Sequence, residues 1–416
     1  MALPSSGQLS MSDINTELGN SSTAQITLND TGVRTLLQRT SAQTEIGMNA
    51  GYSKYYEPVP RAFVQFYSFI LNNYEVSGFN GYNHKYIKVN KDTFTATDAG
   101  NLAGLANYNF GITLATTSYG RGAGRTPWVS IPGSNTGLLF GADASGSGKT
   151  FVVRVTPTST SMTTIKTGID RVYPRAAGYG PAGYIYSTAR GSPSFTRYVN
   201  TSPDLSSWTE TQVPYLLHNF VGTPNAYTAM AAPVGGNWII QSSTNGTSWT
   251  NRVTLPGQDN TSGAYGAGTI VYAQCYFGSG TVNIYRSTND GVSWTNINFQ
   301  LPENVNGDLV APEMLYAGNG TFVLIASATS GILHRYVCRS TDKGASWTYT
   351  KYTNFVAGAA YAHNYRGFSS TDGSIVYVAA GSVKQSLDFG ATWTTKTIPQ
   401  KFTPGQYGVS TIFPIF

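Results

Sequence analysis

The chain has 416 residues, including 46 glycines and 28 tyrosines, and only 11% of its residues are charged. This composition favours short strands joined by tight turns and argues against a helical bundle, while 40% hydrophobic residues argue against an intrinsically disordered chain. The formal net charge is +6, but the basic residues are spread singly, so we expect no binding to nucleic acid.

The N-terminal sequence has no features of a secretion signal. The first residues, MALPSSGQLSMSD, lack the basic region and the apolar region of a signal peptide. The longest apolar run, Ala62 to Leu71, is much shorter than the ~20 residues that a membrane-spanning helix needs. We therefore expect assembly in a cytoplasm and no membrane insertion.

Residues 1–70 differ in pattern from the rest of the chain. Ser10 to Gly19 predicts a short helix, with serine as its N-cap and glycine at its end. Thr23 to Leu28 predicts a strand, and Asn29-Asp30-Thr31 can cap a second helix that continues to Leu37. This segment has too little apolar surface for a robust fold of its own, so we expect it to become ordered by docking on a larger partner.

The same segment resembles a known phage module. Ala2 to Gly19, followed by Ile26 to Asp30 and Val33-Arg34, is similar to the N-terminal module of tailed-bacteriophage tail-fibre and other virion proteins. The resemblance departs after Leu37, and the alternative is a generic capped helix and strand that lead into the next domain. It implies that this segment attaches to the virion, and that the anchoring residues are Ser10, Ser12, Asp13, Ile14, Leu18, Asn29 and Asp30.

A short phrase recurs through the rest of the chain. The full-length copies are STDKGASWT from Ser340, SLDFGATWT from Ser386 and STNDGVSWT from Ser287. Two copies, starting at Ser202 and Ser243, are one residue shorter. A sixth copy, Thr156 to Met162, is degenerate and has methionine at the tryptophan position. Successive copies are 41 to 53 residues apart, which suits one four-stranded propeller blade.

These phrases resemble the Asp-box, or BNR repeat, of sialidase-like and sortilin-like β-propellers. In such a turn an Asp or Asn side chain accepts hydrogen bonds from nearby backbone N–H groups, and glycine adopts a conformation that is costly for other residues. The tryptophan buries its ring against the neighbouring sheet. We therefore predict structural turns between the third and fourth strands of each blade, built on Asp204, Trp208, Asn245, Trp249, Asn289, Gly291, Trp294, Asp342, Gly344, Trp347, Asp388, Gly390 and Trp393.

Apolar runs place the inner strands of the blades. These runs are Gly137–Phe140, Tyr184–Tyr186, Thr269–Ala273, Thr321–Ile325 and Ser374–Val378. The stretch from about Tyr74 to Asp98, with strands at His84–Val89 and Phe94–Thr97, supplies a first blade that the C-terminal strand 407–413 closes. The predicted fold is all-β: a seven-bladed β-propeller with Asp-box turns in residues 71–416, after a small mixed α/β anchoring segment in residues 1–70. Six or eight blades are the nearest alternatives.

Sialidase-like hydrolysis is the main enzymatic alternative. It needs an arginine triad, a Tyr–Glu pair and an acidic residue. The family's Arg-Ile-Pro phrase has only an imperfect counterpart at Arg125-Thr126-Pro127, and the pairs Tyr56-Glu57 and Tyr74-Glu75 precede most of the propeller. We therefore expect no catalytic residues and no enzymatic activity.

Other candidate sites are weaker still. His84, His218, His334 and His363 have no metal-ligand spacing, and we expect Cys275 and Cys338 to be buried apolar thiols on neighbouring blades. Gly120–Arg125 is interpreted as a turn, and Gly146–Thr150 as a hairpin rather than a phosphate-binding loop. No metal and no cofactor are expected.

These observations lead to one functional expectation with two alternatives. We expect a non-enzymatic virion protein, present in several copies on the phage tail. Its N-terminal segment is expected to bind other virion proteins, and its propeller to bind a glycan or protein on the host cell surface. The alternatives are a purely architectural part of the tail or baseplate, and a sialidase-like hydrolase. The sequence does not identify the ligand-binding residues.

Overall fold

The computed structural model divides the chain into two compact units, 1–59 and 60–416. The residues that it describes lie between Ala62 and Ile415, with gaps at 71–81, 91–95, 102–107, 110–127, 131–136, 144–149, 156–159, 167–172, 191–195, 234–235, 258–260, 276–278, 305–311, 328–333, 356–364, 380–381 and 397–406. The predicted N-terminal helices, the strand Thr23–Leu28 and all the proposed anchoring residues therefore lie outside the described residues.

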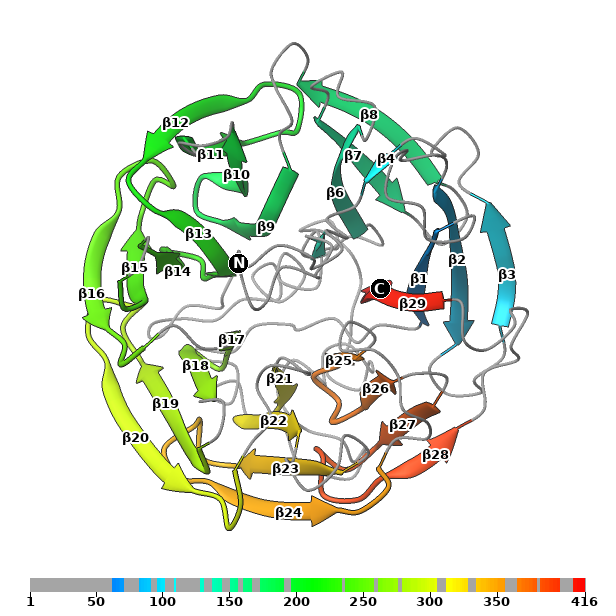
Figure 1. Cartoon of the computed structure of the whole chain (residues 1–416), viewed down its shortest axis with the longest axis vertical. Coiled ribbons are helices and arrows are strands. Elements are labelled where there is room, and N and C mark those ends of the chain that lie inside the picture. Colours follow the sequence, from blue (N-terminus) through cyan, green and yellow to red (C-terminus); the bar gives the residue numbers. More distant parts are fainter. Residues whose placement is uncertain are drawn as a thin grey trace, which may run out of the picture. The chain divides into compact units, whose positions relative to one another are not determined.

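All the regular elements in the described part of the chain are β-strands, arranged as six four-stranded sheets and one five-stranded sheet (Figure 1). We number the sheets in chain order. Sheet 1 contains β29 (Tyr407–Ile415), β1 (Ala62–Ile70), β2 (Tyr82–Asn90) and β3 (Ala96–Asn101). Sheet 2 contains β4 (Tyr108–Asn109), β5 (Trp128–Ser130), β6 (Gly137–Asp143), β7 (Thr150–Val155) and β8 (Thr160–Lys166).

Sheets 3 to 7 are antiparallel meanders of consecutive strands. Sheet 3 has β9 (Tyr173–Gly180), β10 (Gly183–Arg190), β11 (Thr196–Ser202) and β12 (Thr209–Val213), and sheet 4 has β13 (Leu216–Gly222), β14 (Tyr227–Ala232), β15 (Ile239–Ser243) and β16 (Thr250–Thr254). Sheet 5 has β17 (Thr261–Gly266), β18 (Thr269–Cys275), β19 (Thr281–Ser287) and β20 (Thr295–Gln300). Sheet 6 has β21 (Glu313–Gly318), β22 (Thr321–Ser327), β23 (Arg335–Ser340) and β24 (Thr348–Tyr352), and sheet 7 has β25 (Tyr365–Ser369), β26 (Ile375–Ala379), β27 (Ser382–Ser386) and β28 (Thr394–Lys396).

The innermost strands of the sheets contact one another in a closed order. β9 contacts β13, and the contacts continue through β17, β21 and β25 to β29. They then return through β5 to β9, so the sheets follow one another around a ring (Figure 1). Radial sheets in a closed ring define a β-propeller, so the predicted all-β propeller fold is confirmed.

The apolar runs found in the sequence form the second strand of their sheets. Every residue of β18 and of β22 is buried. These strands lie between two neighbours in their own sheet and are covered by adjacent sheets on both faces, so they have no polar alternation. The outer strand β24, by contrast, is exposed at four of its five positions and consists of Thr, Tyr and Lys.

The first sheet starts earlier in the chain than the sequence pattern indicated. The apolar run after residue 60 forms β1, which pairs with β2 on one side and with the C-terminal strand β29 on the other. The boundary expected at residue 70 therefore coincides with the end of β1, whereas the compact units divide between Val59 and Pro60. This run has no box phrase beside it, so the repeat pattern could not assign it to a sheet.

The sixth, degenerate phrase does not form a box turn around Met162. Met162 lies inside β8 and pairs with Val153 of β7. The pairing begins at Val155 and Thr160, which leaves only residues 156–159 between the strands. Seven residues, Ser202 to Trp208, separate the paired residues Thr201 and Thr209 in sheet 3. The connection between β7 and β8 is therefore too short to form a box turn like the one in sheet 3.

Candidate functional site

Five box turns connect the third and fourth strands of sheets 3 to 7. They begin at Ser202, Ser243, Ser287, Ser340 and Ser386, and each of these serines is the last residue of its strand. Because every turn joins the same pair of strands, all five occupy the same end of their sheets, which we call the box end. The predicted turn residues meet within each turn, and the five turns belong to five different sheets.

The turn of sheet 6 shows the chemistry that holds each box together. Asp342 Oδ1 accepts hydrogen bonds from the backbone N–H groups of Ala345 (3.1 Å) and Ser346 (2.9 Å) and from Ser340 Oγ (2.7 Å). Asp342 Oδ2 accepts a fourth bond from Ser346 Oγ (2.6 Å). Ser340 Oγ in turn accepts the N–H of Gly344 (2.8 Å). The carboxylate is thus fully engaged inside its own turn.

The other four turns repeat this pattern. Their Asp or Asn Oδ1 accepts backbone N–H groups near the end of the turn, and the first serine hydroxyl accepts the N–H of the residue three or four positions later. The acceptors of the backbone bonds are Asp204 (from Ser206 and Ser207), Asn245 (from Thr247 and Ser248), Asn289 (from Ser293) and Asp388 (from Thr392).

The difference in length between the boxes corresponds to one left-handed residue. The shorter turns have a single residue with positive φ after the Asp or Asn: Leu205 (φ 68°) or Gly246 (φ 75°). The longer turns have two in succession, as in Lys343 (φ 59°) and Gly344 (φ 81°). Leu205 is a position that sequence reasoning did not single out, because a leucine carries no sign of a left-handed backbone.

Each box tryptophan lies between its own sheet and the preceding one. The indole N–H donates to the carbonyl of the left-handed residue three positions earlier, at 3.0 to 3.2 Å. The rings pack beside aromatic residues of the inter-sheet layers; the pairs and centroid distances are Trp208–Phe140 (6.1 Å), Trp249–Phe220 (5.8 Å), Trp294–Tyr272 (5.7 Å), Trp347–Phe299 (6.2 Å) and Trp393–Phe355 (5.3 Å). The hydrogen bonds of the turn, which we call the clasp, hold the indole ring in place, and the ring packs between two neighbouring sheets.

These hydrogen bonds also keep the box acids ionised. The side-chain and backbone hydrogen bonds of Ser206, followed by the backbone N–H of Ser207, hold the pKa of Asp204 well below its usual value. Burial raises the pKa of Asp342, but hydrogen bonds from Ser346, Ser340 and Ala345 outweigh it and lower this pKa to about 2. The pKa of Asp388 is lowered by the same balance, with Thr392 and Ser386 as donors. A carboxyl group with a lowered pKa is a poor proton donor at neutral pH.

Two arginines link neighbouring boxes, and sequence reasoning missed both of them. Arg286 Nε in sheet 5 donates to the Lys343 carbonyl in the box of sheet 6, at 2.7 Å. Arg339 Nε in sheet 6 donates in the same way to Phe389 in sheet 7, at 2.8 Å. Each arginine directly precedes the first serine of its box, and this shared position is the signal that could have revealed them.

The two histidines with described side chains have neighbours within the fold. His218 stacks on Trp238 with ring centroids 5.5 Å apart, and His334 Nδ1 accepts the backbone N–H of Asn354 at 3.0 Å. The side chains of His84 and His363 lie outside the described residues, as do those of Arg121, Arg125 and the Tyr–Glu pairs. Thr150, the last residue of the phosphate-loop-like phrase, is the first residue of β7.

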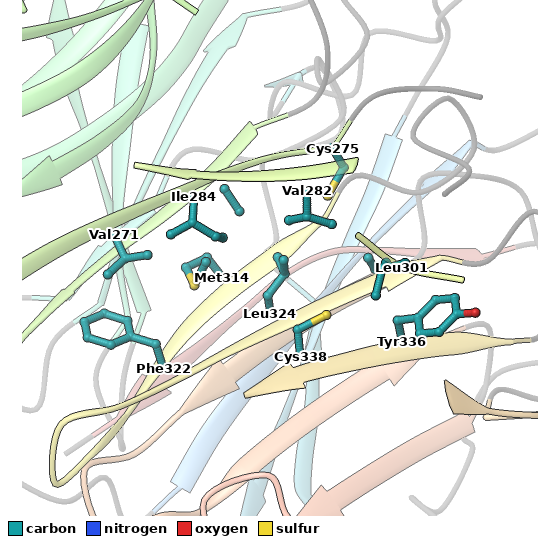
Figure 2. Packing of buried hydrophobic residues seen from close by; sticks show 12 residues of the cluster. Val271, Cys275, Val282, Ile284, Leu301, Met314, Phe322, Leu324, Tyr336 and Cys338 are labelled. Carbon is teal, nitrogen blue, oxygen red and sulfur yellow. The ribbon is translucent and has the colours of Figure 1, made fainter. Parts of the chain in front are cut away.

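Neither cysteine forms a disulfide bond, and both are buried, as predicted. Cys275 ends β18 in sheet 5, and Cys338 lies in β23 of the neighbouring sheet 6. Figure 2 shows both thiols in the apolar layer between the two sheets, which also contains Phe322 and Leu324 of β22. Burial, followed by the proximity of Cys275, raises the pKa of the Cys338 thiol well above its usual value. The two residues thus behave as apolar core side chains.

Among the residues that the structure describes, no three His, Cys, Asp or Glu side chains are grouped so as to hold a metal ion. A helix long and apolar enough to cross a membrane does not occur among the same residues.

The two ends of sheets 3 to 7 carry connections of different length. At the box end, the first and second strands are joined by two to five residues, as at 181–182 and 370–374. At the opposite end, which we call the open end, the chain passes between sheets and from second to third strands. Its longest connections there are 301–312 and 353–364. The box end thus carries the internally bonded box turns, and the two longest connections between these sheets lie at the open end.

No protein-family model and no curated protein match the sequence. Among solved structures, a streptogramin B lyase matches with a TM-score of 0.45 and 12% identity over 68% of this chain and 86% of its own. A Hadza microbial sialidase matches with a TM-score of 0.42 and 9% identity over 65% of this chain, which spans only 63% of the sialidase. An Aleuria aurantia lectin, solved with α-methyl-L-fucoside, matches with a TM-score of 0.39 and 12% identity over 68% of this chain and 96% of its own. The fold assignment rests on the sheet order and the closed ring of contacts.

Proposed function

We propose that this chain is a non-enzymatic virion protein of a tailed bacteriophage, with a seven-bladed propeller that binds a glycan or protein on the host cell surface. On this proposal, sheets 1 to 7 are the seven blades, the five-stranded sheet is the second blade, and β29 closes the first. The N-terminal segment attaches the protein to the tail, where several copies multiply weak binding into avidity.

The observation that carries this proposal is the difference between the two ends of the propeller. At the box end, Asp204, Asp342 and Asp388 are occupied by hydrogen bonds within their own turns, so they are not available as catalytic acids. The two longest connections, 301–312 and 353–364, lie at the open end, and so does the connection between β18 and β19, whose sequence Tyr276-Phe277-Gly278-Ser279-Gly280 contains aromatic and small residues. Such a composition suits adaptable polar contacts around aromatic anchors.

Attachment to a phage tail is supported by the sequence alone. The phrase from Ala2 to Gly19, with Ile26–Asp30 after it, is the feature that resembles virion-attachment modules. The basic net charge of +6 is compatible with approach to an anionic cell envelope.

The test is binding of the fluorescently tagged full chain to intact candidate host cells and to their purified surface glycans. We expect saturable, strain-specific binding with no release of sugar. The double variant Tyr276→Ala/Phe277→Ala at the open end should weaken binding, and Val292→Ala at the box end should not. Val292 is a fair control because it is 56% exposed in a box turn.

Three outcomes contradict the proposal in different ways. Release of sugar from the glycan would indicate a hydrolase. Retention on assembled tails without binding to any host would indicate an architectural component. Loss of binding in Val292→Ala alone would place the binding surface at the box end.

A further inference from the structure

Sheets 2 and 3 bury polar side chains that have no hydrogen-bond partner among the described residues. Asn200 on β11 is 1% exposed, and neither its Oδ1 nor its Nδ2 has a partner there. The hydroxyl groups of Thr188 on β10 and Thr150 on β7 are in the same situation, at 0% and 1% exposure. A dry amide with both ends unpaired costs much more free energy than folding normally tolerates, so these groups need an account.

Asn200 and Thr188 lie on the face of sheet 3 that looks toward sheet 2. Asn200 is directly opposite Tyr186 in the strand register, and Thr188 follows two residues later on β10. Alternation along a strand therefore puts all three on one face. Tyr186 packs in a cluster with Phe140 and Val152 of sheet 2, which identifies that face.

Thr150 approaches the same layer from the other side. It follows the same alternation as Val152, two residues along β7, so it faces sheet 3. Phe140, which pairs with Val152, has its ring centroid 5.4 Å from that of Tyr186, so these residues are level with one another. One step further along each sheet, Thr150 reaches the level of Thr188. The three polar side chains thus face the same layer from two sheets.

Small polar side chains face this layer from both sheets. Packed sheets are about 10 Å apart, and aromatic rings fill that distance at Phe140 and Tyr186. Thr188 and Thr150 are too short to do so on their own, and Tyr198, which is opposite Thr188 in the strand register, faces the same layer. A bound water both donates and accepts hydrogen bonds and makes about three of them, which suits a site with an amide N–H₂ group, an amide oxygen and two hydroxyls. A metal ion does not suit it, because the three residues supply no carboxylate and the amide N–H₂ group is a hydrogen-bond donor.

We propose that ordered water binds between sheets 2 and 3, where it bridges the Asn200 amide to the hydroxyls of Thr188 and Thr150. The water lies beside the apolar cluster of Phe140, Val152 and Tyr186 and adds a polar contact between the two sheets. The layer between sheets 5 and 6, in which twelve buried residues meet, is apolar.

The test is a Thr→Val pair in the full chain, because valine keeps the shape of threonine and removes only the hydroxyl. If water binds the hydroxyl, Thr188→Val loses a hydrogen bond, and the midpoint of thermal unfolding falls by about 1–3 °C. If the hydroxyl is dry, valine removes a buried unpaired group, and the midpoint stays the same or rises, which would overturn the proposal. Thr350→Val, at an exposed position on β24, controls for the β-propensity of valine.

A crystal structure of the full chain at high resolution supplies the second measurement. We expect a density peak within hydrogen-bonding distance of the Asn200 amide and at least one of the two hydroxyls. A peak with short metal–oxygen distances of about 2.3–2.6 Å, or direct bonds between the three side chains, would overturn the proposal.

Discussion

The box turns of sheets 5 and 6 have the same length and the same fold but differ in their central residue. In sheet 5, Asn289 Oδ1 accepts the N–H of Ser293, and Asn289 Nδ2 donates to Ser293 Oγ at 2.9 Å. In sheet 6, Asp342 Oδ1 accepts the corresponding N–H, but its Oδ2 accepts a hydrogen bond from Ser346 Oγ at 2.6 Å. The hydroxyl of the serine simply reverses its role, from acceptor to donor.

This comparison indicates what the turn requires. It requires one planar oxygen that accepts backbone N–H groups, and a second polar atom of either kind that holds the hydroxyl. It does not require a negative charge. We therefore expect the box aspartates to be interchangeable with asparagine at neutral pH, whereas a catalytic acid or a metal ligand would not be.

The largest effect is expected from removal of the tryptophan that the clasp holds. Trp347→Ala should destabilise the protein by about 3–4 kcal/mol, because the indole packs into the layer between sheets 5 and 6 and stacks on Phe299. Tyr349→Ala, a nearby aromatic that is 44% exposed, should cost less than about 1 kcal/mol. Denaturant unfolding of both variants measures the difference, and equal losses would mean that the clasp does not anchor the ring.

Gly344→Ala should be the next most costly change, at about 2–3 kcal/mol. Its φ is 81°, and an added Cβ would lie 2.8 Å from Val271 Cγ2 in sheet 5, so backbone strain and overpacking add together. Gly268→Ala is a matched control, because its φ is 73° and no atom lies within 4 Å of the added Cβ. It should cost only the backbone part, about 1 kcal/mol.

A second substitution sharpens this prediction. Val271 is fully buried, so Val271→Ala is destabilising by itself. The double variant with Gly344→Ala should nevertheless lose less than the sum of the two single losses, because the methyl groups that the new Cβ meets are gone. Strictly additive losses in denaturant unfolding would show that the contact between the two sheets is not the source of the cost.

Exchange of the central residue tests the comparison directly and should have a smaller effect. Asp342→Ala removes the acceptor of two backbone N–H groups, and we expect a loss of about 1 kcal/mol, similar to the loss of a helix N-cap. Asp342→Asn and Asn289→Asp should each change stability by less than about 0.5 kcal/mol at neutral pH. If Asp342→Asn costs as much as Asp342→Ala, the charge is needed after all.

The sequence predicted the parts of the fold that local turn chemistry determines. Each of the five full or shortened box phrases marks a third and a fourth strand, and in sheets 3, 5, 6 and 7 the predicted apolar run before it marks the second, as for β18, β19 and β20 around Asn289. Sheets 1 and 2 have no full box phrase, so β1 was assigned to the N-terminal segment and Met162 to a turn. Arg286 and Leu205 were missed because their roles depend on the neighbouring box and on backbone geometry, which a single phrase does not encode.

The smallest expected effect is the response of the Asp boxes to acid. The folded-state pKa of Asp342 is about 2 and that of Asp388 is also lowered, so each carboxylate contributes stability that is fully present above the unfolded pKa, near 4. This contribution falls as the pH drops from about 4 through about 2, because the carboxylates become protonated. The box of sheet 5 has no such dependence, since Asn289 does not titrate.

Denaturant midpoints of the wild type and of Asp342→Asn, measured between pH 2 and pH 7, test this prediction. The two proteins should be close in stability at pH 7, and the wild type should lose more stability than the variant as the pH falls below about 4. Most of the remaining slope belongs to other acids, including Asp204 and Asp388, which are unchanged in both proteins. Parallel curves would mean that hydrogen bonds in the turn hold the protonated and the ionised side chain equally well. The Asp and Asn boxes would then be equivalent at acidic pH as well as at neutral pH.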